Sequence, residues 1–235
     1  MSAASVGGMT TLIAEDLLLL LLDDETGSAT SSYVDVALGG AVLLELALAG
    51  AVTVRERTSI WSGAKVAVTP GTTTLGDPLL DSALPLVAER ERSASDLVHR
   101  LGKGVKDVLA ARLAARGLLR RHDDKVLGLF PRTRWLAADT AHEVDVRRHL
   151  TAVLVQGVEP DARTGALVAL LSAVDKAPAS VDHDGVPKRE VRRRAKEVAQ
   201  GAWAADAVKD AIAASTAAIV AGVTAATAAT TATSG

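Results

Sequence analysis

The spacing of apolar residues predicts a chain built mainly of helices. An apolar stretch that follows Thr11 and ends at Leu22 predicts a first helix, with Thr11 as its N-cap and acidic residues in its first turn. Apolar residues at 34, 38, 42 and 46 repeat at helical spacing and predict a mostly buried second helix that ends at Gly50. The same reasoning predicts further helices at about 78–90, 95–100, 105–119, 141–156, 161–175, 188–200 and 203–222.

Short β-like runs predict two hairpins at the edge of this helical core. Residues 51–57 and 65–68 form the first hairpin, and residues 125–129 and 133–136 form the second, with its turn around Pro131. The predicted fold is therefore mainly α, a compact helical core with peripheral short β-hairpins. We expect a flexible N-terminus over 1–10, one helical domain over 11–222 and a flexible Ala/Thr-rich tail over 223–235.

Composition supports packed helices and excludes cysteine chemistry. The 235 residues include three Trp, one Tyr and one Phe, so Leu, Val and Ala must fill the core. The absence of cysteine excludes disulfides, thiolate metal sites and cysteine nucleophiles. The apolar run that ends at Leu22 is too short for a signal peptide or a membrane span, and residues 211–235 fit an Ala-rich helix better than a span, because Ala and Thr gain little in hydrocarbon.

Charge is distributed unevenly along the chain. Residues 1–50 contain seven acids and no Lys or Arg, whereas residues 99–135 contain ten Lys and Arg against three Asp. Residues 188–196 add six bases and one acid. We therefore expect the middle of the chain to present a basic face.

The sequence holds no recognisable catalytic motif. A Gly-x-Ser-x-Gly elbow, a Gly-x-x-x-x-Gly-Lys-Ser/Thr phosphate loop and a Gly-x-Gly-x-x-Gly fingerprint are all absent. His142 and His149 lie two turns apart on one predicted helix face, which leaves open a metal site with an outside carboxylate, although surface histidines are commoner. His183 lies among Asp and Gly residues that favour a turn. We expect a docking protein rather than an enzyme, with no metal and no cofactor.

Two basic segments are candidates for binding. Lys103 and Lys106 lie one turn apart beside a predicted helix start, where backbone N–H groups favour a phosphate, and Arg100 adds positive charge. The alternative is a solvated helix start with lysines in water. In the second hairpin, the apolar residues are flanked by Arg and Lys, a pattern typical of insertion among acidic headgroups or of self-association, with ordinary core packing as the alternative. The apolar residues of this hairpin are Leu127, Leu129 and Phe130.

The segment 105–136 also permits a nucleic-acid interpretation. A helix that carries Arg112 and Arg116, followed by a basic two-stranded ribbon, has the order of a winged helix. The acidic first fifty residues count against it, so nucleic acid is not the partner that we expect. A scaffold that binds an acidic protein partner is a further alternative.

Three stretches together resemble the Golgi phosphoprotein 3 family, over roughly residues 10–220. Their order and spacing carry the resemblance more than any single motif does. Supporting matches are Asp77-Pro78-Leu79-Leu80-Asp81 and residues 166–171, while Arg192 to Glu197 and Gly201-Ala202-Trp203 resemble bacterial members, in particular those of high-GC actinobacteria. The three main stretches are Leu12 to Leu20 with Asp23-Asp24-Glu25-Thr26-Gly27, Gly40-Ala41-Val42-Leu43-Leu44-Glu45-Leu46-Ala47-Leu48-Ala49-Gly50, and Leu109 to Leu119.

The resemblance implies an all-helical core with peripheral hairpins and a peripheral membrane protein. Eukaryotic members bind phosphatidylinositol 4-phosphate and link the tails of Golgi glycosyltransferases to coat transport, a role that a bacterium without a Golgi cannot share. Their headgroup pocket uses a Trp, an Arg before the second helix and two basic residues three apart. Lys103 and Lys106 match the two basic positions, whereas Gly39 stands at the Arg position and Thr30 near the Trp position.

These expectations combine into one hypothesis. We expect a cytoplasmic domain that associates peripherally with the inner face of the plasma membrane. Its partner is an anionic phospholipid headgroup, bound by Lys103, Lys106 and Arg100, and the 125–136 hairpin inserts into the membrane or mediates self-association.

Overall fold

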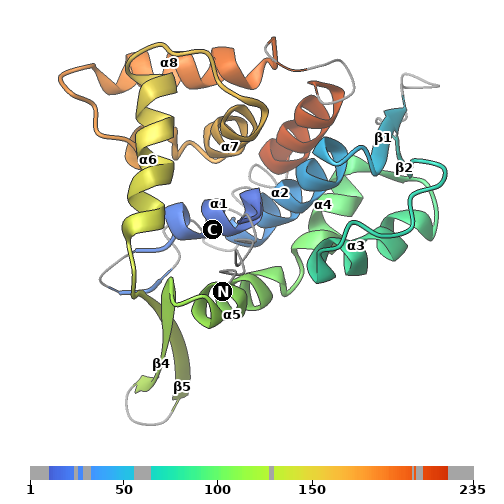
Figure 1. The fold of residues 1–235 in the computed structure, drawn as a ribbon, viewed down its shortest axis with the longest axis horizontal. Coiled ribbons are helices and arrows are strands. Elements are labelled where there is room, and N and C mark those ends of the chain that lie inside the picture. Colours follow the sequence, from blue (N-terminus) through green and yellow to red (C-terminus); the bar gives the residue numbers. More distant parts are fainter. Residues whose placement is uncertain are drawn as a thin grey trace, which may run out of the picture.

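Helix α1 (Ile13–Leu21) lies at the centre of the molecule, and all nine of its residues are buried. The computed structural model describes residues 11–23, 26–28, 33–55, 65–126, 130–202, 204 and 209–221. Around α1 pack the helices α2 (Val34–Leu48), α5 (Val105–Ala115), α6 (Ala141–Leu154) and α7 (Ala162–Ala173) (Figure 1). A helix that is buried on every side requires such complete coverage.

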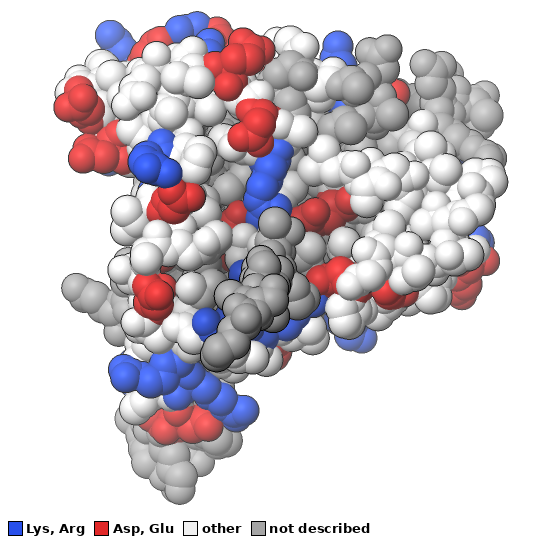
Figure 2. Space-filling model, in the orientation of Figure 1, with Lys and Arg blue, Asp and Glu red and all other residues white. Residues whose placement is uncertain are grey.

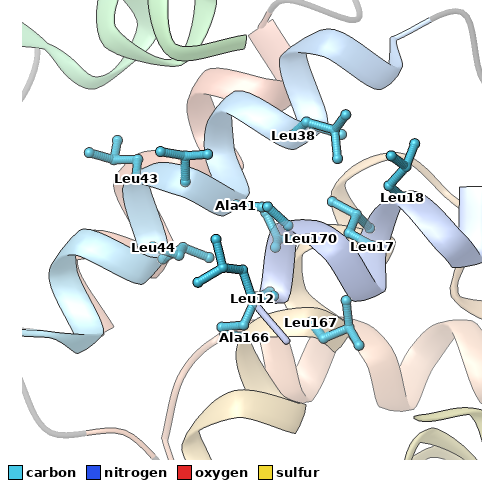
Figure 3. Packing of buried hydrophobic residues seen from close by; sticks show 14 of the residues in the cluster. Leu12, Leu17, Leu18, Leu38, Ala41, Leu43, Leu44, Ala166, Leu167 and Leu170 are labelled. Atoms are coloured by element: carbon cyan, nitrogen blue, oxygen red, sulfur yellow. The ribbon is translucent and has the colours of Figure 1, made fainter. Parts of the chain in front are cut away.

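Leucine and alanine side chains fill the centre of the core. Figure 3 shows the side chains of α1, α2 and α7 directed toward one another, with Leu17 and Leu167 among them. Leu17, Leu38 and Leu44 are completely shielded from solvent. The core therefore has the aliphatic composition expected from the scarcity of aromatic residues.

Helices α2 and α4 (Ala94–Gly102) cross with their backbones in contact. A Cβ atom added to Gly39 would lie 2.0 Å from the carbonyl oxygen of Val98, and one added to Gly102 would lie 2.1 Å from the carbonyl oxygen of Asp35. Neither helix has room for a side chain at this crossing, because the obstructing atoms belong to the backbone. The crossing fixes the position of the chain segment that follows Gly102.

Two small antiparallel sheets lie at the periphery. One contains β1 (Val52–Arg55), β2 (Lys65–Val68) and β3 (Arg92–Ser93), in that order. The other is a hairpin of β4 (Leu119–Val126) and β5 (Phe130–Ala137), which projects from the lower edge in Figure 1. At its base, the N–H of Trp135 donates to the carbonyl oxygen of Gly27 at 3.5 Å.

The remaining elements complete the helical fold. Helix α3 (Pro78–Ala88) precedes β3, and a 3₁₀ turn, η1 (Ala177–Ser180), leads to α8 (Lys188–Ala199), while residues 209–221 form a last described helix beside β1. Among the described residues, no helix is both long and apolar enough to cross a bilayer. The fold class predicted from the sequence, mainly α with short hairpins, is confirmed.

Two local predictions were wrong. Helix α1 begins after Leu12 rather than Thr11, because the carboxylate of Glu15 accepts a hydrogen bond from the N–H of Leu12 at 2.8 Å. The second hairpin begins at Leu119, and Pro131 pairs with Lys125 within the strands instead of forming the turn. The predicted flexible ends, 1–10 and 223–235, lie outside the described residues, as does Trp203 near the predicted start of the last helix.

Candidate functional site

The turn between α4 and α5 separates the two predicted phosphate-binding lysines, Lys103 and Lys106, which lie on either side of Gly104. Gly104 adopts a left-handed conformation, with φ of 73°, and ends the turn where α5 begins. As a glycine, Gly104 offers no side chain to accept a hydrogen bond from the first backbone N–H groups of α5. Lys103 is exposed and Lys106 is half-buried, and no carboxylate of the described residues lies within ion-pair distance of either lysine.

Arg100 lies one turn before the lysines, but it is partly neutralised. Its Nε atom donates to the carboxylate of Asp96 at 3.1 Å, and Arg92 binds the same carboxylate. Desolvation would raise the pKa of Asp96, but the hydrogen bonds and charges of the two arginines outweigh it and hold that pKa below its usual value. The net positive charge of this corner therefore comes mainly from the lysines.

A shallow cavity of about 180 Å³ lies between α3 and α5, next to these cations. Its floor is apolar, with Val42, Leu101 and Val105 buried beneath it. Lys103 and Arg100 line one edge, whereas Lys106 is not among the lining residues. The cavity thus combines an apolar floor with a basic edge.

The arginines of the winged-helix alternative point into the protein. Arg112 donates to the carboxylates of Glu15 and Asp77 at 3.0 and 2.7 Å, and Arg116 binds the other oxygen of Glu15 at 3.1 Å. The Glu15 side chain is fully buried, and Asp77 also caps α3 through the N–H groups of Leu79 and Leu80. These guanidinium groups stabilise a core carboxylate, which disfavours their use on DNA.

A second buried acid lies beside the first. The carboxylate of Asp16 binds His142 Nε2 at 2.7 Å and Arg163 at 2.6 Å, which links α1 to α6 and α7. Glu45, on α2, accepts a hydrogen bond from the N–H of Ile13. Burial raises the pKa of Glu45 above its usual value, although this hydrogen bond and the charge of Arg163 oppose the shift.

The two histidines of the possible metal site line one cavity of about 170 Å³ together with Asp16. However, His142 is bound to Asp16, and Nδ1 of His149 donates to the carbonyl oxygen of Asp145 at 2.8 Å. Within the described ranges, no group of three His, Asp or Glu side chains is placed to hold a metal ion. His183 binds the carbonyl oxygen of Pro178 in the turn, as its sequence context suggested.

The basic segment 188–196 is partly neutralised within the fold. Arg192 binds Asp175 at 2.6 Å, and Arg193 binds both Glu190 and Glu197 on α8 itself. Lys188 and Lys196 are exposed, and the described part of the chain offers them no ion-pair partner. The segment is therefore a weaker cationic surface than its sequence suggests.

Comparison with protein families gives one decisive match. Residues 13–215 match the family model described as Golgi phosphoprotein 3 (GPP34). The chain belongs to this family. A search of curated proteins found no match. The family assignment made from the three sequence stretches is confirmed.

At the position where the resemblance placed the pocket Arg, Gly39 has no room for a side chain. Gly39 lies within α2, buried at the crossing with α4, and not in the loop before the helix. An Arg side chain cannot be added there without separating the two helices. Thr30, near the Trp position of the family, lies outside the described residues, and Tyr33 stands at the N-cap position of α2.

The hairpin that the family resemblance links to membrane insertion is present, but its tip is not described. Leu127 and Leu129 lie outside the described residues, and Phe130 is placed only as the first residue of β5, paired with Val126. Nearer the base, Arg120 and Arg121 are exposed. Figure 2 shows Lys and Arg gathered at the base of this hairpin, with acidic residues closer to its tip.

Proposed function

We propose that this protein docks reversibly on membranes that contain anionic phospholipids, with Lys103 and Lys106 binding headgroup phosphate. The observation that supports the proposal most directly is the pair of lysines at the uncapped start of α5, with no acidic partner among the described residues. The partial positive charge of a helix N-terminus adds to that of the two lysines. Membership of the Golgi phosphoprotein 3 family supports the same interpretation.

The proposed interaction is weak and reversible. Each basic side chain near an anionic surface contributes about 1 kcal/mol, so two lysines give roughly 2 kcal/mol. A stable association therefore requires further contacts, for which the hairpin of β4 and β5 is the first candidate. Its insertion into the headgroup layer, or its use in self-association, is part of this proposal.

We propose a preference for anionic lipid in general rather than for phosphatidylinositol 4-phosphate. Gly39 provides no charged group, and the backbone of α4 leaves no space for a side chain at this crossing. The lysines are point charges without the planar fork of an arginine, so they recognise phosphate charge more than headgroup geometry.

We place this activity on the cytoplasmic side of the plasma membrane, and we propose a binding role rather than catalysis.

Vesicle flotation of the purified protein tests the proposal. Neutral phosphatidylcholine vesicles are compared with vesicles that also contain phosphatidylinositol, cardiolipin or phosphatidylinositol 4-phosphate. We expect flotation with every anionic composition, weakening as salt is added. Flotation restricted to the 4-phosphate lipid would contradict the proposed breadth, and no flotation at physiological salt would refute membrane docking and leave a protein scaffold as the better hypothesis.

A pair of double variants tests the assigned residues. Lys103→Glu/Lys106→Glu should weaken binding at least roughly 30-fold, because two contacts of about 1 kcal/mol are lost and repulsion is added. The matched control is Lys188→Glu/Lys196→Glu, which makes the same change in net charge on α8, at the opposite edge of the molecule in Figure 1. Equal losses of vesicle binding in both variants would contradict a phosphate-binding site at α5 and would indicate attraction by net charge alone.

A further inference from the structure

We propose that the groove between α3 and α5 faces the bilayer, with Leu86 and Val108 entering the interfacial layer while Lys103 contacts phosphate. This inference rests on the proposed membrane docking and adds the surface that makes the contact. It assigns an apolar component to the site, on residues outside the hairpin of β4 and β5.

The exposed apolar side chains identify this groove. In the described part of the chain, five large hydrophobic side chains are exposed, at positions 86, 108, 144, 158 and 220. Of these, Leu86 and Val108, which are 41% and 48% exposed, line the same cavity as Lys103 and Arg100. Apolar side chains beside cations are the combination that binds the interface of an acidic membrane.

Two of the acidic residues near the groove have partners within the fold. Residues 82–88 on α3 carry no charge. Asp81 is occupied by the hydroxyl of Thr74 and the N–H of Leu75, and Asp77 is bound by Arg112. Asp107 is the exception, because it is exposed on the first turn of α5 beside Lys106.

The dimensions of the groove favour a membrane over an enclosed ligand or a protein. Its volume of about 180 Å³ is below the roughly 300 Å³ at which small-molecule pockets begin. Two exposed apolar side chains supply far less area than the roughly 800 Å² that each partner buries in a stable protein complex. Shallow insertion of two side chains requires neither depth nor a large flat area.

The arrangement of the elements permits simultaneous contact with one surface. In Figure 1, α3, α5 and the hairpin of β4 and β5 all lie along the lower edge of the molecule, whereas α8 lies along the upper edge. A bilayer at the lower edge would therefore meet α3, α5 and the hairpin together, and residues of α3 and α5 line the groove. Each additional apolar side chain that enters the interface should strengthen binding roughly three- to tenfold.

The absence of cysteine makes a site-specific test direct. Single variants Leu86→Cys, Val108→Cys and Val144→Cys are labelled with an environment-sensitive fluorophore and mixed with phosphatidylcholine vesicles that contain phosphatidylglycerol. Val144 is the control, because it is 61% exposed but lies on α6, outside the groove. Flotation of the same labelled proteins measures binding independently of the label.

We expect a blue shift of emission at positions 86 and 108 and none at 144, and a roughly tenfold or greater loss of vesicle affinity for Leu86→Ser/Val108→Ser. Flotation without a shift at 86 and 108 would overturn this inference and leave the proposed function intact. Absence of flotation would overturn both. A shift on addition of an acidic amphipathic peptide, with none on addition of vesicles, would also overturn it by identifying a peptide groove.

Discussion

The buried ion pairs around Glu15 make replacement of Arg112 a demanding test of the structure. In Arg112→Met, the long apolar stem is retained and the guanidinium group is removed. Of its described partners, Glu15, which has no solvent access, then keeps Arg116 and the N–H of Leu12, and Asp77 loses two hydrogen bonds. Breaking a buried pair from one side costs about 3–5 kcal/mol, because the remaining charge is left desolvated.

We expect the cost of Arg112→Met to lie at the lower end of that range. Arg116 still compensates part of the Glu15 charge, and Asp77 is 15% exposed and continues to cap α3. The expected loss of unfolding free energy is therefore about 3 kcal/mol, which lowers the melting temperature by about 6–12 °C in a domain of this size. Urea denaturation followed by far-ultraviolet circular dichroism measures the loss directly.

Arg193→Met is the matched control. Arg193 also binds two carboxylates, those of Glu190 and Glu197, but its side chain is 58% exposed on α8. Exposed pairs of this kind contribute about 0–1 kcal/mol. If Arg112→Met lost less than about 1 kcal/mol, no more than the control, the inference that burial makes the Glu15 pairs essential would be refuted.

Three further predictions concern other parts of the structure. Gly39→Ala should lower the unfolding free energy by about 1–3 kcal/mol in the same urea assay, because its Cβ meets the backbone of α4; a neutral effect would contradict the close crossing. Burial raises the pKa of Glu45 in the folded protein, so its contribution to stability falls as the pH rises through that pKa. Glu45→Gln should therefore gain stability relative to the unsubstituted protein as the pH rises above the usual carboxyl pKa, and a constant difference would exclude this titration. Asp107→Asn should strengthen flotation with anionic vesicles by roughly fivefold, because it removes an exposed acid beside Lys106; unchanged flotation would indicate that α5 does not face the membrane.

The sequence predicts those parts of the fold that depend on local spacing. Helix α2 follows from its apolar period and Gly50, and α3 follows from Asp77 and Pro78 at its start. The hairpin turn was misplaced because Pro131 suggested a turn. Each strand of this two-stranded sheet has only one neighbour, so a proline that lacks an N–H is tolerated on the open side.

The candidate site was only partly predictable from the sequence. Spacing reveals residues that are close along the chain, but it does not reveal contacts between distant segments. Lys103 and Lys106 are recognised from their spacing, since they lie three residues apart on either side of Gly104. The roles of Arg112 and Arg116 could not be recognised in this way, because Glu15 lies 97 and 101 residues earlier in the chain. Periodicity likewise indicates that a helix has a buried face, but it does not indicate that Gly39 contacts the backbone of another helix.

The central position of α1 has a consequence for synthesis of the chain. This helix is translated before the other described helices of the domain, yet the partners of Asp16 on α6 and α7 lie 126 and 147 residues further along. Until α7 has been translated, the leucines of α1 are not completely buried, and its acidic residues lack some of the positively charged partners that they have in the folded protein. At about 5–20 residues per second, this interval lasts roughly seven to thirty seconds, which makes the nascent helix α1 a natural substrate for chaperones.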